Sequence, residues 1–176
     1  YANTNGERVT TTHKDYETRF KYDSGKKPIE IANYGKDDSL MVDVTGIAKT
    51  TYKMDDKGRV TEARHFGSDE SLKEKNTPKL QADRVLTAIS AGAITKYTYD
   101  GDNMMPSKIA FYGKDEQPLG IKAWGNIASY KLKYTKERNV AEISTYGTDD
   151  APVPLDRDII GDNVVKLIMS YDDHGN

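Results

Sequence analysis

The chain has 176 residues, with 26 basic and 28 acidic side chains, so its net charge is only −2. Leu, Ile, Val and Phe make up about 18% of the residues, just below the level of roughly 20% at which disorder is expected, but the balanced charge argues against disorder. The mixed charge and the lack of a long apolar run argue against a nucleic-acid partner and a membrane-spanning helix, and the lack of Cys excludes disulfides and thiolate metal sites.

A two-part pattern recurs along the chain. Its first landmark is usually Tyr followed by Asp, at 22–23, 54–55, 99–100 and 134–135, where the second copy begins with Met54 and the fourth ends with Thr135. Its second landmark follows twelve or thirteen residues later and reads aromatic, Gly, a variable residue, Asp and a second acid, at 34–38, 66–70, 112–116 and 146–150. Four copies with such constant spacing indicate an internal repeat.

Each copy reads as a β-hairpin. The segment that leads into the first landmark alternates aromatic with charged or hydroxylated residues, which is the period of a half-buried strand. Asp and Gly then favour a tight turn, and a second strand returns to the second landmark. In the returning strand Glu30, Glu62 and Glu142 share one position, at which the third copy has Lys108. We therefore expect hairpin units at about 16–34, 47–66, 93–112 and 126–146, with a partial unit at 164–176.

The linkers between the hairpins vary in length. In the longest, Ala82, Val85, Leu86 and Ile89 follow helical spacing, which predicts a short helical insertion near 78–91. The rest predicts a mostly β fold, in which tandem antiparallel β-hairpins form one elongated or curled sheet over 1–176. The chain begins and stops in mid-repeat, so we expect it to be a fragment of a longer repeat protein.

The repeat resembles a known family. Tyr-Asp dipeptides, a turn containing Gly and a returning strand with Glu resemble the tandem Tyr-Asp (YD/RHS-like) repeats of bacterial exported proteins, and are similar to MORN-like hairpin repeats. Met54 and Thr135 depart from the dipeptide. The resemblance implies β architecture, a secreted or bacterial cell-surface setting and a role in interaction, and it implies no catalytic residue.

Few residues suggest catalysis or metal binding. The three histidines, His13, His65 and His174, lack a partner at metal-ligand spacing, and we expect them to be exposed on strands and turns. No nucleophile elbow or phosphate-binding Gly loop occurs. The paired acids of the second landmark could build calcium sites, but we favour a role for Asp in stabilising the turns. We expect no metal, no cofactor and no enzymatic activity.

The candidate binding residues are aromatic. Stacked hairpins would align a ladder of rings, which either binds a sugar or peptide or packs as a thin core; we favour the core, because a long exposed apolar stripe invites aggregation. The only Trp lies in a linker and either anchors that loop on the sheet or contacts a ligand. The candidates are Trp124, Tyr97, Tyr99, Tyr130 and Tyr134.

The expected function is that of a non-enzymatic repeat protein, secreted or displayed on a bacterial surface, that binds a protein or glycan ligand as an adhesin or scaffold. Two alternatives remain open. The array could be a glycan-presenting accessory region of a larger enzyme or toxin, or it could be a purely structural stalk.

Overall fold

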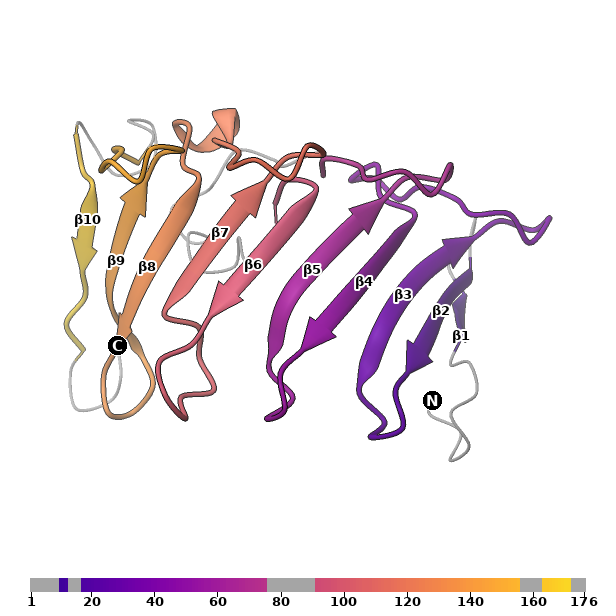
Figure 1. Cartoon of the computed structure of the whole chain (residues 1–176), viewed down its shortest axis with the longest axis horizontal. Helices are drawn as coiled ribbons and strands as arrows, with labels where there is room; N and C mark the ends of the chain where they lie inside the picture. The colour runs from indigo at the N-terminus through magenta and orange to yellow at the C-terminus, as the bar shows by residue number, and fades with distance from the viewer. Residues whose placement is uncertain (1–9, 13–16, 76–90, 156–162, 172–176) are drawn as a thin grey trace.

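The computed structural model describes residues 10–12, 17–75, 91–155 and 163–171, and these form one open antiparallel sheet (Figure 1). Its ten strands lie side by side in chain order, so every strand pairs with its neighbour in sequence. The strands are β1 (Thr10–Thr12), β2 (Glu17–Tyr22), β3 (Pro28–Tyr34), β4 (Lys49–Met54), β5 (Val60–Phe66), β6 (Ile94–Thr98), β7 (Lys108–Tyr112), β8 (Ser129–Tyr134), β9 (Val140–Tyr146) and β10 (Lys166–Ile168). The predicted mostly β fold of tandem hairpins is confirmed, and the sheet does not close on itself.

Four hairpins, β2–β3, β4–β5, β6–β7 and β8–β9, fall within the unit boundaries expected from the sequence. In three of the hairpins, the side chain of the second residue of the first landmark holds the hairpin turn. The Oδ1 atom of Asp55 accepts a hydrogen bond from the amide of Arg59 at 2.9 Å, and Asp23 accepts one from Lys27 at 2.8 Å. Thr135 substitutes for Asp in the fourth hairpin, because its hydroxyl accepts from the amide of Asn139 at 3.3 Å.

The second landmark forms a tight turn at the opposite end of each hairpin. Its Asp accepts a hydrogen bond from the amide two residues further on, at 3.2 Å for Asp37 and 3.0 Å for Asp149, and Asp69 and Asp115 do the same. The second acid of each landmark adopts a positive φ, for example 61° at Glu116. These local bonds confirm that the repeated Asp residues stabilise turns.

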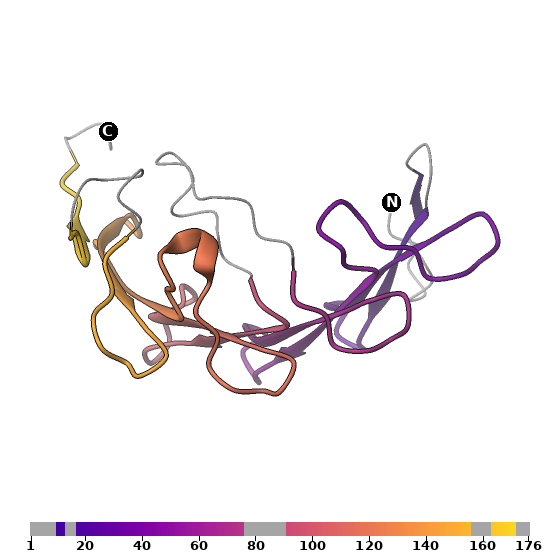
Figure 2. The same cartoon turned by 90° about the horizontal axis from the view of Figure 1, so that it is seen from above.

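Alternation along the strands gives the sheet two unlike faces. One, the core face, carries the apolar side chains, and η2 (Lys122–Trp124) and its loop pack on it; this face lies on the concave side of the arc that the sheet forms in Figure 2. Phe111, Ile127 and Ile143 are fully buried there. The other, the charged face, carries Arg, Lys and Glu side chains together with the aromatic rings of the second landmarks.

Three tyrosines at the first-landmark position tie their unit to the hairpin before it. The hydroxyl of Tyr99 donates to the carbonyl of Val60 at 2.8 Å, that of Tyr134 to Pro106 at 2.9 Å, and that of Tyr171 to Val140 at 2.7 Å. Each acceptor stands two residues before the position that Glu30 occupies in the first hairpin. The hairpins are therefore joined by a repeated side-chain bond as well as by strand pairing.

The helical insertion predicted near 78–91 falls almost wholly on residues 76–90, which lie outside the described residues. At its end, Gly92 pairs with Lys75 in an isolated bridge, so the two ends of this linker meet. Among the described residues, no helix has the length and apolar character needed to cross a membrane.

Candidate binding surface on the charged face

The structure places the five candidate aromatic residues on the core face or at its margin. Trp124 is 2% exposed and Tyr130 is 3% exposed, and both rings meet Phe111 edge-on, with centroid separations of 5.4 and 5.8 Å. Tyr97 packs against this cluster, while Tyr99 and Tyr134 donate the hydroxyl bonds described above. The stripe therefore packs as core, and Trp124 anchors its loop on the sheet. A binding role for these five residues stays a prediction.

Tyr130 carries a polar group into this core. Its hydroxyl is buried and has no hydrogen-bond partner among the described residues. Burial raises the pKa of this phenol far above its usual value, so it stays neutral.

His65 corrects an expectation from the sequence. It was expected to be exposed, but it lies on the core face at 3% exposure, with its Nδ1 atom 3.0 Å from the hydroxyl of Thr50. Burial lowers its pKa to about 4, with the nearby charge of Lys75 acting in the same direction. Alternation puts Phe66 on one face and His65 on the other, but only the strand register and the linkers decide which face is covered. His13 and His174 lie outside the described residues.

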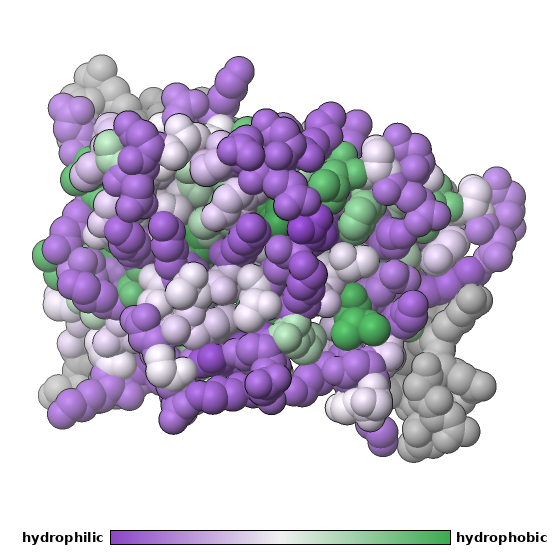
Figure 3. Space-filling view, in the orientation of Figure 1, coloured by the Kyte–Doolittle hydropathy of each residue, from purple (hydrophilic) through white to green (hydrophobic). Residues whose placement is uncertain are grey.

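The charged face repeats one contact in every hairpin. A cation lies over the aromatic ring of each second landmark, at 4.1 Å from the centroid for Arg19 over Tyr34 and 4.0 Å for Lys131 over Tyr146. Lys49 over Phe66 and Lys96 over Tyr112 complete the set. Figure 3 views this face, on which hydrophilic side chains predominate. The result is a row of aromatic rings covered by cations, and an exposed pair of this kind is worth about 0.5–1 kcal/mol.

The second acid of each landmark folds back onto this face. Asp38 pairs with Arg19 and Glu70 with Lys49, while Glu116 accepts from Arg64 at 2.8 Å. The hydrogen bond from Arg64 lowers the pKa of Glu116 below its usual range, so this carboxylate stays charged at neutral pH. The paired acids thus have two roles, in which the first holds the turn and the second neutralises a cation.

The Glu position of the returning strand supplies further ion pairs. Glu62 lies 2.9 Å from Lys53 and 2.6 Å from Arg64, and Glu142 lies 3.2 Å from Lys133 and 3.0 Å from Lys166. Hydrogen bonding to Lys166 lowers the pKa of Glu142, and Lys133 acts in the same direction. Each Glu thus sits between two cations and neutralises part of their charge.

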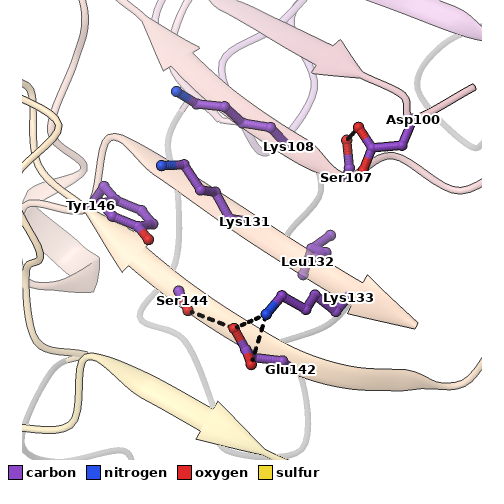
Figure 4. A pocket seen from close by; sticks show the side chains of 9 residues that line it. All are labelled: Asp100, Ser107, Lys108, Lys131, Leu132, Lys133, Glu142, Ser144 and Tyr146. Carbon is purple, nitrogen blue, oxygen red and sulfur yellow. Dashed lines mark hydrogen bonds and ion pairs between the residues drawn. The ribbon is translucent and has the colours of Figure 1, made fainter. Parts of the chain in front are cut away.

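A hollow of about 420 Å³ opens on the charged face over β7, β8 and β9 (Figure 4). It is lined by Asp100, Ser107, Lys108, Lys131, Leu132, Lys133, Glu142, Ser144 and Tyr146. Its volume lies within the range of about 300–1,000 Å³ typical of small-molecule sites. Within the described part of the chain, no group of three or more His, Asp or Glu side chains is placed to hold a metal ion. This surface presents cations, carboxylates, hydroxyls and an aromatic ring for contact with a partner.

Sequence reasoning missed this surface. The signal that could have found it was the position shared by Glu30, Glu62 and Glu142, at which Lys108 breaks the pattern. The aromatic residues of the second landmark also stand out in the sequence, but their position on the face opposite to the core requires the strand register.

No protein-family model matches the chain, and no curated protein matches it. The structure shows the architecture alone, a series of antiparallel hairpins in one sheet.

Proposed function

We propose that this chain is a non-enzymatic binding module, in which the charged face of the hairpin array contacts a protein or glycan partner outside a bacterial cell or on its surface. The observation that carries the proposal is the recurrence of one arrangement on the charged face, a cation over an aromatic ring, in all four hairpins. An array of repeated contacts suits an extended partner, which meets several repeats at once.

The distribution of polar groups supports binding rather than catalysis. His65, the histidine of the described residues, is buried on the core face and stays neutral above a pKa of about 4, so it is unsuited to proton transfer at the surface. The carboxylates of the charged face are held ionised by cations, which suits fixed recognition of a ligand more than proton exchange.

A structural stalk is the second candidate. The bonds from Tyr99, Tyr134 and Tyr171 tie the later units of the array to their neighbours, as an array that carries mechanical force requires. A stalk does not require a particular arrangement of charges on the charged face, so charge substitutions there would leave its function intact.

Binding assays separate the two. The chain, immobilised on a sensor surface, is screened against extracellular-matrix proteins and a panel of neutral and acidic glycans. We expect binding that weakens as salt is raised and that falls in Lys96→Ala, on the charged face, but not in Lys122→Ala, an exposed residue of η2. A screen without any binder would contradict the binding module and favour the stalk.

A further inference from the structure

The third hairpin breaks the charge pattern of the array. In the other hairpins the shared position of the returning strand is a Glu that faces a lysine across the strand pair, such as Lys53 opposite Glu62 and Lys133 opposite Glu142. In the third hairpin that position is Lys108, whose partner within the hairpin is Thr98. On its other side, the residue opposite Lys108 on β8 of the next hairpin is Lys131. Two like charges directly opposite each other destabilise a sheet.

The counter-charge at this place is weak. Asp150 is the acid that the second landmark of the fourth hairpin brings to the pair, and its carboxylate lies 3.4 Å from Nζ of Lys108 and 3.7 Å from Nζ of Lys131. Its side chain is 60% exposed. One solvated carboxylate is therefore shared between two cations, whereas Arg19 pairs with Asp38 and Lys49 pairs with Glu70. The pair keeps an excess positive charge.

The surroundings of the pair offer further recognition groups. In Figure 4 the two amines extend side by side toward the end of the hollow where Tyr146 lies, and Lys131 covers the Tyr146 ring. Further along the hollow, Glu142 and Asp100 provide carboxylate acceptors, and Ser144 provides a hydroxyl. The site therefore offers donors for an anion at one end and acceptors for hydroxyl groups at the other.

We propose that this hollow binds an acidic sugar residue of a glycan, whose carboxylate or sulfate lies between Lys108 and Lys131 while its hydroxyl groups donate to Glu142 and Asp100. The proposal rests on the binding function proposed above and gives it a ligand class. An acidic sugar combines the anion and the hydroxyl donors that the hollow requires. DNA or a phosphatidylserine surface supplies phosphates without sugar hydroxyl donors for Glu142 and Asp100, so it fits this end of the hollow less well.

Two substitutions with opposite effects test this assignment. Lys108→Glu restores the pattern of the other hairpins, so we expect the melting temperature to stay at or above that of the unaltered protein, while affinity for the glycan falls at least about tenfold through loss of a charge-assisted contact. Asp150→Asn removes the competing carboxylate and keeps a residue type that tolerates its positive φ, so we expect affinity to rise by about threefold or more. Lys122→Glu makes the same charge change as Lys108→Glu in η2, outside the hollow, and serves as the matched control.

The affinities are measured by calorimetry with the full chain against polygalacturonate, dextran sulfate and unmodified dextran, and by sedimentation with phosphatidylserine vesicles. Binding of polygalacturonate or dextran sulfate that Lys108→Glu weakens, Asp150→Asn strengthens and Lys122→Glu leaves unchanged supports the site, and the polymer that binds identifies the anion. Equal losses of affinity in Lys108→Glu and Lys122→Glu, or binding only to a matrix protein in the wider screen, would overturn the glycan site but leave the binding module standing. Binding only to vesicles would overturn both proposals. An absence of binding to every probe and to the wider screen would overturn both.

Discussion

The hydroxyl bonds that join successive hairpins offer a stability test with an internal reference. Tyr99, Tyr134 and Tyr171 each donate to a backbone carbonyl of the preceding hairpin, at 2.8, 2.9 and 2.7 Å. A neutral hydrogen bond of this kind contributes about 1 kcal/mol net, so Tyr→Phe at each position should lower the free energy of unfolding by about that amount. For a domain of this size, about 1 kcal/mol corresponds to a fall in melting temperature of about 2–4 °C.

The second hairpin provides the reverse change. Met54 occupies the Tyr position, and the carbonyl of Pro28 stands where Val60 and Val140 stand in the later hairpins. Met54→Tyr should therefore create the missing bond and raise the free energy of unfolding by up to about 1 kcal/mol. Urea unfolding followed by circular dichroism measures both series. Loss of stability in Met54→Tyr, together with no loss in the Phe variants, would refute the view that these hydroxyls join the hairpins.

Two further predictions concern the core face and its linkers. The pKa of His65 is about 4 in the folded chain and about 6.5 in the unfolded chain, so the unfolded chain binds more protons between these pH values. The free energy of unfolding should therefore be highest above pH 6.5 and fall by about 3 kcal/mol as the pH drops to 4. His65→Gln should flatten this pH dependence, measured by urea titrations at stepped pH. An unchanged slope would show that His65 is not the group responsible. Gly92→Ala should lower the free energy of unfolding by about 2 kcal/mol or more, because φ is +68° and a Cβ there would meet the carbonyl oxygen of Tyr112 at 2.7 Å. Gly101→Ala, where φ is +55° and the surrounding space is open, should lower it by about 1 kcal/mol. Thermal unfolding measures both variants. Equal losses in the two variants would contradict the close approach at Gly92.

The hairpins could be predicted from the sequence because their signals are local. A period of two, a polar turn residue and a fixed distance between landmarks depend on residues close together in the sequence. Asp55 and Asp149 hold their turns in the structure, because each accepts a hydrogen bond from a nearby backbone amide. The order of the strands in the sheet follows from these units, since consecutive elements are usually adjacent in space.

The candidate binding surface could not be predicted in the same way, because it depends on the register between strands. Tyr134 and Tyr146 are both aromatic residues at strand ends, yet one lies on the core face and the other on the charged face. Alternation separates them within one hairpin, but which face is covered depends on where Trp124 and its loop pack. Likewise Lys108 was visible as a departure from Glu, but its place opposite Lys131 required the pairing of β7 with β8.

The most direct test of the charged face as a binding surface is a map of backbone amide shifts by NMR during titration with polygalacturonate. We predict that the largest shifts cluster at Lys108, Lys131 and Tyr146, and that they vanish in Lys108→Glu. Shifts centred instead on the loop around Trp124, with the charged face unmoved, would contradict the account and place the binding surface on the core face.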